Sequence, residues 1–337
     1  MKLSLKIRNT LIALLIFSNQ LVAQTTYDHK LLEVIADIEK NYAGFSNKVD
    51  NQRVPYEFFK ADLINQSINN TTQLRAHVDR YLQFFNDGHL YSFNFNINNF
   101  EHQLNKHRKE LYQFKVVNDN TCYLKIGSFS NKINVDSLLA TAYDAMSQHK
   151  NLIIDIRNNG GGGDSSFDKL LPIIATNDMF VRNIDLLATP DNWKHMKSIV
   201  KLPEWNPSYE NQFVSAPWIN SKEEYLKLYK YKATNEFPKN VAVLMNRKTG
   251  SAAEQFVLCA KQSFKVKTFG ENTSGSFDYS NCRHFEVIKD SLYISAPSTR
   301  VKTLPDNKID PNGMSPDFYL RPENQIEQVL KYIQKWE

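Results

Sequence analysis

The stretch Val241–Phe256, VAVLMNRKTGSAAEQF, contains the change from strand to helix on which the fold depends. Its first half is a short apolar run, typical of a strand buried in a sheet. A Lys-Thr-Gly turn ends the run, and Ser251 then opens a segment with apolar residues at helical spacing. The turn lifts the serine hydroxyl clear of the sheet, next to N–H groups that have no partner inside the helix. Ser251 is therefore a candidate nucleophile.

The same residues have a second interpretation. Ser251 and Glu254 form the pattern S-x-x-E, the capping box that closes many ordinary helix N-termini. Taken alone, this stretch favours a capping serine over a nucleophile, so the choice depends on what the rest of the chain contributes.

A second turn between strand and helix lies upstream. Leu152–Ile156 is a nearly continuous apolar run, as expected for a strand covered on both faces. It leads into Arg157–Asp164, RNNGGGGD, whose glycines predict a backbone that closely approaches another group, although a plain flexible turn is the alternative. The Gly-Lys-Ser/Thr ending of a phosphate loop is absent, which argues against nucleotide binding. Strands and helices alternate from Tyr123 to Phe269 and predict an α/β core with antiparallel additions.

The N-terminal part of the chain predicts a small helical cap. Apolar residues recur at helical spacing in Tyr27–Tyr42, Tyr56–Ile68 and Thr72–Phe85. An Asn-Asp-Gly turn ends the third helix and places His89 at the start of an extended segment. A lone histidine is more often structural than catalytic, but a carboxylate, Asp87, lies two residues before this one.

The first 23 residues have the pattern of a secretory signal peptide: a basic start, the apolar run Leu11–Phe17, and Ala23 before an expected cut at Gln24. The run is too short for a permanent membrane span, and we expect a periplasmic or secreted protein. The chain has 337 residues and a formal net charge of +5, but outside this segment 38 basic side chains oppose 36 acidic ones. This near balance argues against a nucleic-acid binder.

The cysteines do not indicate a metal site. Cys122, Cys259 and Cys282 include no C-x-x-C pair, and no metal or organic cofactor is expected. One disulfide is compatible with an oxidising compartment, but the sequence does not choose its partners.

Three motifs together resemble the serine peptidase family of the C-terminal processing peptidases and the tricorn protease. Leu152–Gly162, LIIDIRNNGGG, is similar to the family's D-L-R-x-N-x-G-G strand and loop. Val241–Phe256 is similar to its nucleophile strand and turn. The third is Gly270–Gly275, GENTSG, taken together with Gly313–Asp317, GMSPD, and both are similar to later parts of the family pattern. The resemblance implies a ClpP/crotonase-like α/β core and a serine peptidase.

The resemblance also implies which residues act. Some members use a serine and a lysine, but Ser276 stands where that lysine is expected. Tricorn-like members use serine, histidine and glutamate, with the histidine in a D-G-H segment that matches Asp87-Gly88-His89. Asp310, one methylene shorter, stands at the position of their glutamate. The implied catalytic triad is Ser251, His89 and Asp310.

These residue types suit acyl transfer. A serine hydroxyl becomes an effective nucleophile when an imidazole takes its proton, and a carboxylate holds the second ring nitrogen. The oxyanion needs two donors, for which we predict the N–H groups of Ala252 and of Gly161 or Gly162. Because His89 comes from the cap, we expect the site to assemble when cap and core close together.

The predicted organisation is a signal peptide at 1–23, a helical cap at 24–110 that carries the Asp-Gly-His segment, and a catalytic α/β domain at 111–337. An insertion at about 177–238, rich in Trp, Tyr and Lys, interrupts the α/β alternation; it is either a lid beside the site or a peripheral decoration. Too little chain separates His89 from Cys122 for the PDZ domain of many family members. The expected partner is a peptide or protein substrate. Two alternatives are a non-catalytic protein that binds peptides or small apolar ligands on the same fold, and an esterase-like serine hydrolase.

Overall fold

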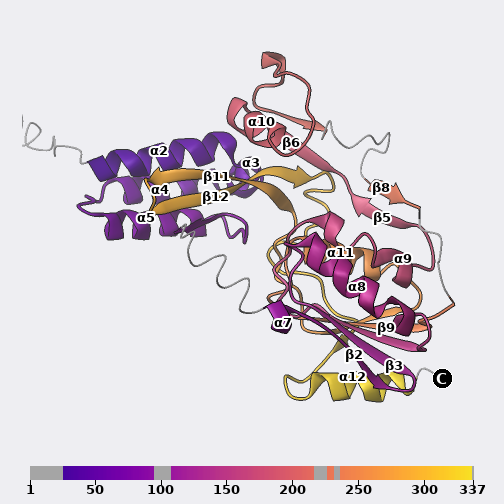
Figure 1. The fold of residues 1–337 in the computed structure, drawn as a ribbon. Coiled ribbons are helices and arrows are strands. Elements are labelled where there is room, and N and C mark those ends of the chain that lie inside the picture. The colour runs from indigo at the N-terminus through magenta and orange to yellow at the C-terminus, as the bar shows by residue number, and fades with distance from the viewer. Residues whose placement is uncertain (1–25, 95–107, 216–225, 231–235, 336–337) are drawn as a thin grey trace, which may run out of the picture.

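The computed structural model describes residues 26–94, 108–215, 226–230 and 236–335. The predicted signal peptide at 1–23 lies outside these ranges. Every helix within them falls short of the length and apolar character that a membrane span requires. The predicted α/β class is confirmed: helices cover a mainly parallel sheet, and a helical cap lies at one end of the molecule (Figure 1).

In the described chain, a six-stranded sheet forms the centre of the core, in the order β13-β10-β9-β4-β3-β2. Its strands run parallel except β2, which pairs antiparallel with β3. Every residue of β4 is buried, which accounts for its continuous apolar run, because a parallel sheet covered on both faces exposes neither. The strands are β2 (Tyr112–Asn118), β3 (Thr121–Ile126), β4 (Asn151–Asp155), β9 (Asn240–Met245), β10 (Val266–Gly270) and β13 (Phe318–Tyr319).

Helices cover both faces of this sheet (Figure 1). Val241 and Val243 of β9 face α8, α9 and α11, whereas Ala242 and Leu244 face α12. Successive residues of a strand point to opposite faces, so one apolar run supplies both halves of the core. The helices are α8 (Lys132–Met146), α9 (Leu171–Ile174), α11 (Ala252–Ala260) and α12 (Gln325–Ile333), with the short elements α7 (Arg108–Leu111) and η2 (Asp164–Ser166).

A second sheet is antiparallel and joins the core to the cap. Among the described residues its strands follow the order β1-β12-β6-β7, and β11 also pairs with β12. The hairpin of β11 and β12 extends along the cap helices (Figure 1). β1 begins two residues after His89 and places Tyr91 opposite Ser295 of β12. The strands are β1 (Tyr91–Phe93), β6 (Ile184–Ala188), β7 (Gln212–Ser215), β11 (Tyr279–Ile288) and β12 (Leu292–Val301).

The predicted cap helices are present, within a few residues of their expected ranges. Their hydrophobic core includes Leu292 and Ile294 from the hairpin, both almost fully buried. Burying a side chain of this size contributes roughly 1.5–3 kcal/mol. Residues from far along the chain therefore complete the core of the cap. The predicted boundary between cap and catalytic domain at residue 110 leaves these residues out. The helices are α2 (Thr26–Asn41), α3 (Phe45–Val49), η1 (Asp50–Gln52), α4 (Arg53–Ile64) and α5 (Thr71–Gln83).

The described part of the insertion contacts both the core and the cap: Met179 of β5 lies in the core cluster of the central sheet, whereas later residues reach the cap. Its strand β6 pairs with β12, so the second sheet is built partly from the insertion. Thr189 Oγ1 donates to Asn41 Oδ1 at 2.7 Å, and Asn192 Nδ2 donates to the Asn41 carbonyl at 2.9 Å. The segment is thus anchored to the end of α2, and its role as a lid stays a prediction. It also contains β5 (Met179–Arg182), α10 (Pro190–Lys197), η3 (Pro207–Tyr209) and β8 (Leu226–Tyr229).

Candidate active site

Ser251 lies where the sequence predicts it, on the turn between β9 and α11. It is the N-cap residue of α11, with φ 55° and ψ −123°, a conformation that residues with side chains rarely adopt. Its backbone N–H lies 3.1 Å from the carbonyl oxygen of Ser276 and 3.1 Å from Oε2 of Glu254. Backbone strain of this kind is concentrated at functional sites, and a strained turn between strand and helix exposes a nucleophilic serine in other hydrolases.

Glu254 connects the serine turn to the loop 270–276. Its carboxylate is fully buried and accepts hydrogen bonds from Thr273 Oγ1 at 2.6 Å and from the N–H groups of Gly275 and Ser276, each at 2.9 Å. It also accepts the N–H of Ser251, as a capping glutamate does. The sequence pattern predicted this last bond, but the bonds to the loop were missed. Glu254 therefore fixes both the serine turn and the loop beside it.

The glycine loop makes the close backbone approach that the sequence predicts, and the group it approaches is Ser251. A Cβ on Gly161, whose φ is 103°, would lie 2.7 Å from the Ser251 Cβ and 2.9 Å from the Ala252 nitrogen. Ala252 is the first residue of α11, so its N–H has no partner inside the helix. The Gly161 N–H already donates to Asn159 Oδ1 at 2.9 Å. The Gly161 N–H is therefore already bonded within the loop, and the role of Gly162 as the glycine donor stays a prediction.

His89 is held through both its backbone and its ring. Its N–H donates to Asp87 Oδ1 at 2.8 Å, and its Nδ1 lies 2.6 Å from the carbonyl oxygen of Tyr279 on β11. A carbonyl only accepts, so Nδ1 carries the hydrogen of the neutral ring and Nε2 carries the lone pair. His89 is thus held in the tautomer that a general base at Nε2 requires.

The segment before His89 reaches the serine turn through one shared neighbour. A Cβ on Gly88 would lie 2.0 Å from Oγ of Ser276, and the carbonyl of Ser276 accepts the N–H of Ser251. Ser276 is the residue that the family resemblance places at the position of the lysine in serine–lysine members. Here it lies between the histidine segment and the serine turn, and it brings two of the predicted site segments together.

Asp310 is buried close by, but its bonds in this structure are to backbone groups. Its Oδ1 accepts the Phe277 N–H at 2.6 Å, its own N–H donates to Asp278 Oδ2 at 3.0 Å, and its Oδ2 is buried without a partner. Burial, followed by the charges of Asp278 and Asp87, raises the pKa of the Asp310 carboxyl to about 8. Because the Tyr279 carbonyl is the partner of the His89 ring, the orienting role of Asp310 stays a prediction.

The sequence matches the family model of peptidase family S41 over residues 120–320. This range is more than half of the chain. The chain belongs to peptidase family S41. The family resemblance drawn from the motifs is thereby confirmed, and membership points to a hydrolase that acts as a peptidase. The matched range of this S41 peptidase contains Ser251 and Asp310, whereas His89 precedes it.

Two solved structures share the fold of this S41 peptidase, and a third is similar to it at a lower score. A candidate peptidase from Parabacteroides merdae ATCC 43184 is 17% identical with a TM-score of 0.56, over 91% of this chain and 93% of that one. A lipoprotein from Streptococcus agalactiae is 14% identical with a TM-score of 0.54, over 94% and 99%. The photosystem II D1 C-terminal processing protease has a TM-score of 0.48 at 13% identity, over 89% and 94%. No curated protein matches the sequence.

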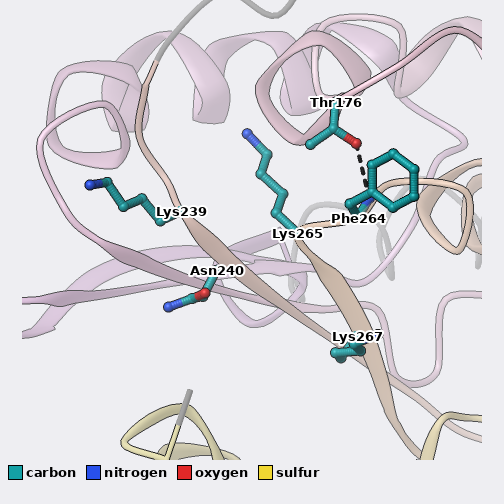
Figure 2. A pocket seen from close by; sticks show the side chains of 6 residues that line it. All are labelled: Thr176, Lys239, Asn240, Phe264, Lys265 and Lys267. Atoms are coloured by element: carbon teal, nitrogen blue, oxygen red, sulfur yellow. Dashed lines mark hydrogen bonds between the residues drawn. The ribbon is translucent and has the colours of Figure 1, made fainter. Parts of the chain in front are cut away.

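A separate pocket of about 370 Å³ lies at the amino ends of β9 and β10 (Figure 2). Ser251 follows the carboxyl end of β9, so the pocket lies at the opposite edge of the sheet. The side chains of Lys239 and Lys265 point in different directions in Figure 2, and Lys239 pairs with Glu236 at 3.3 Å. The pocket lining includes no histidine, cysteine or carboxylate: Thr176, Lys239, Asn240, Phe264, Lys265 and Lys267.

The cysteines of the described chain form neither a disulfide nor part of a metal-binding cluster. Within the described ranges, no group of three or more His, Cys, Asp or Glu side chains could hold a metal ion. Cys122, Cys259 and Cys282 are free thiols. Burial raises the pKa of the Cys122 thiol to about 11, so this side chain is a neutral packing residue near neutral pH.

Proposed function

We propose that this S41 peptidase is a serine peptidase in which Ser251 is the nucleophile and His89 the general base. The proposal rests on one observation: three segments of the chain lie together at the turn that carries Ser251. Ser251 lies in a strained conformation, Gly161 is packed against it, and Ser276 connects it to the segment that carries His89. An ordinary capping serine requires neither the close glycine nor the histidine segment.

The proposed reaction proceeds in two halves. In the first, Nε2 of His89 accepts the hydroxyl proton as Oγ of Ser251 attacks the peptide carbonyl. The resulting oxyanion accepts hydrogen bonds from the N–H groups of Ala252 and Gly162. The imidazolium then gives its proton to the leaving amine, and the acyl group stays on the serine. In the second half, His89 deprotonates a water that attacks the ester, and its proton returns to the serine as the acid is released.

The imidazolium that forms in each half needs stabilisation at Nδ1. The Tyr279 carbonyl accepts that hydrogen and orients the ring, but it carries only a partial negative charge. We assign the full negative charge to Asp310, as the third member of the predicted triad. Because its pKa is about 8, Asp310 is protonated at neutral pH in the resting protein and supplies this charge only when it ionises.

The proposed substrates are peptides or proteins outside the cytoplasm. The family supports the first part of this statement, and the signal-like sequence at 1–23 supports the second. No resident metal or organic group takes part in the proposed reaction.

Active-site labelling tests the proposal. A fluorophosphonate probe is expected to modify Ser251, as mapped by peptide mass spectrometry. Ser251→Ala is expected to lose both labelling and peptide cleavage while its melting temperature is unchanged. Label on another residue, or none on a folded protein, would contradict the proposal and favour a non-catalytic binding protein. Turnover of small esters without peptide cleavage would instead indicate the esterase alternative.

A further inference from the structure

A buried tyrosine of the cap is bonded to the segment that carries His89. Tyr42 follows the end of α2, is 1% exposed, and donates its hydroxyl to Asp87 Oδ2 at 2.6 Å. The other oxygen of Asp87 accepts the N–H of His89 at 2.8 Å. One carboxylate therefore connects a cap side chain to the backbone of the proposed base.

The ring of Tyr42 also contacts the second group that holds His89. Its centroid lies 5.9 Å from that of Tyr279, whose carbonyl accepts from Nδ1 of the histidine. Phe85 packs edge-on against the same ring at 5.4 Å. The next residue, Ala43, donates its N–H to the carbonyl of Pro297 on β12 at 3.0 Å. Tyr42 is thus fixed by its surroundings and touches both residues that restrain the imidazole.

The hydroxyl matters because the carboxylate that it binds is buried. Asp87 is only 7% exposed, and a buried carboxylate oxygen without a donor is costly. Burial, with the nearby Asp87 charge, raises the pKa of the Tyr42 phenol well above its ordinary value, so the phenol stays a donor. Without this hydroxyl, Asp87 would rotate or admit water to satisfy Oδ2. Either change weakens its bond to the His89 N–H.

We infer that Tyr42 is a positioning residue for His89, acting through Asp87 to hold the imidazole at the distance from Ser251 that proton transfer needs. The inference rests on the proposed function, since it requires His89 to be the base. Tyr42 acts on the base and not on bound substrate. Its loss should therefore slow the chemical step and leave substrate binding unchanged.

The direct test removes one oxygen. Tyr42→Phe keeps the ring and its contact with Tyr279 but removes the donor to Asp87. We expect kcat and the rate of fluorophosphonate labelling to fall about 10- to 100-fold, with KM within about twofold of the wild type. Unchanged rates, or a change confined to KM, would overturn the inference.

A matched control comes from the same cap core. Tyr56 is fully buried, and its hydroxyl donates to Glu39 Oε1 at 2.6 Å, in a bond of the same type that does not reach Asp87. Tyr56→Phe should lower the melting temperature as Tyr42→Phe does, but leave kcat and the labelling rate unchanged. Equal losses of rate in both variants would mean that the cap hydroxyls act only on stability.

A double variant at Tyr42 and Asp87 provides a second, independent test, because it measures whether the two residues affect the labelling rate through the same interaction. Asp87→Asn keeps the phenol and alters the group through which Tyr42 is inferred to act. If the inference holds, the double variant labels no more slowly than the slower single variant, whereas independent losses would multiply. Multiplying losses would overturn it. If Tyr42→Phe does not fold, Asp87→Asn alone must reproduce the loss of kcat at constant KM, and normal kinetics in that variant would count against the inference.

Failure of the inference and failure of the proposed function give different results. If the wild-type protein is not labelled at Ser251, the proposed function fails first. If Ser251 is labelled in the wild type and Tyr42→Phe labels at the same rate, only the positioning role fails.

Discussion

Gly88 and Ser276 are so close that a methyl group on the glycine would lie 2.0 Å from the serine hydroxyl oxygen. This contact joins the cap to the serine turn, because the carbonyl of Ser276 accepts the N–H of Ser251. β1 and β11 both pair with β12, so the chain after His89 and the carbonyl that holds its ring belong to one sheet. The histidine segment therefore adjoins the serine turn in this structure, and a closing motion of the cap stays a prediction.

Gly161→Ala is expected to abolish labelling of Ser251. The added methyl would meet Gly250 O at 2.8 Å and Ala252 N at 2.9 Å, and the φ of 103° is itself unfavourable for alanine. Backbone atoms cannot rotate away as a side chain can, so the serine turn must shift. We expect a loss of about 3 kcal/mol in stability, measured by urea unfolding, together with the loss of label.

The neighbouring glycine provides the control for this prediction. A Cβ on Gly160 would have no heavy atom within 4 Å, so Gly160→Ala should fold and react as the wild type does. If both alanine variants keep their label, the close approach of the glycine loop to Ser251 has no functional consequence.

Glu254→Gln is expected to disrupt the loop 270–276 and the serine turn together. The carboxylate accepts bonds from Thr273, Gly275 and Ser276 on the loop and from Ser251 on the turn, whereas an amide presents one acceptor and a donor to the same groups. At least one buried N–H or O–H is then left facing another donor. The expected cost is about 2–3 kcal/mol, with a labelling rate reduced at least tenfold.

Glu271 makes a suitable comparison for Glu254, because it lies at the start of the same loop and is half-buried instead of fully buried. Glu271→Gln should change the midpoint of urea unfolding and the labelling rate little. A Glu254→Gln protein with normal stability and normal labelling would show that the buried carboxylate is not what holds the turn.

The fold was predictable because its signals are local. Continuous apolar runs identified β4 and β9, and the glycine loop and the Lys-Thr-Gly turn marked where each strand ends. The packing of the β11–β12 hairpin into the cap was not predictable, because it joins Ile294 to helices that lie more than 200 residues earlier in the chain. Contacts at such separation leave no periodic pattern in either segment.

The site was predictable only in part, for a different reason. Residue types with distinctive chemistry, such as Ser251 and His89, can be recognised from motifs. The partner of the histidine ring is the backbone carbonyl of Tyr279, which any residue at that position would supply. The bond of Asp310 to the Phe277 N–H is equally independent of side-chain identity. Sequence patterns report side chains, so interactions made by the backbone are missed.

Export of the protein predicts a shortened chain. If residues 1–23 are a signal peptide, the protein recovered from the periplasm or the medium should begin at Gln24. N-terminal sequencing of the recovered protein measures this directly. Replacing Leu14 and Leu15 in the apolar run with arginine should keep the precursor uncleaved in the cytoplasm, because a signal peptide needs an uninterrupted apolar core. A full-length chain outside the cytoplasm would contradict the prediction.

Asp310 is expected to make the stability of the folded protein fall as the pH rises. Its pKa is about 8 in the folded protein, against an ordinary value of 3.8, because of burial and then the charges of Asp278 and Asp87. Between these two pKa values the folded state holds a proton that the unfolded state has released. The stabilising contribution is therefore complete below about pH 3.8 and is lost as the pH rises through about 8.

Asp310→Asn isolates this contribution, since an amide resembles the protonated carboxyl and cannot ionise. The melting temperature of the variant minus that of the wild type should grow from pH 5 to about pH 8 and level off above that pH, where both states have released the proton. If ionised Asp310 stabilises the imidazolium of His89, the wild-type labelling rate should also rise near pH 8, and the variant should lose that rise. A melting-temperature difference that stays constant with pH would show that Asp310 keeps an ordinary pKa. A pH-dependent difference with an unchanged rate profile would leave Tyr279 as the sole orienting partner of His89.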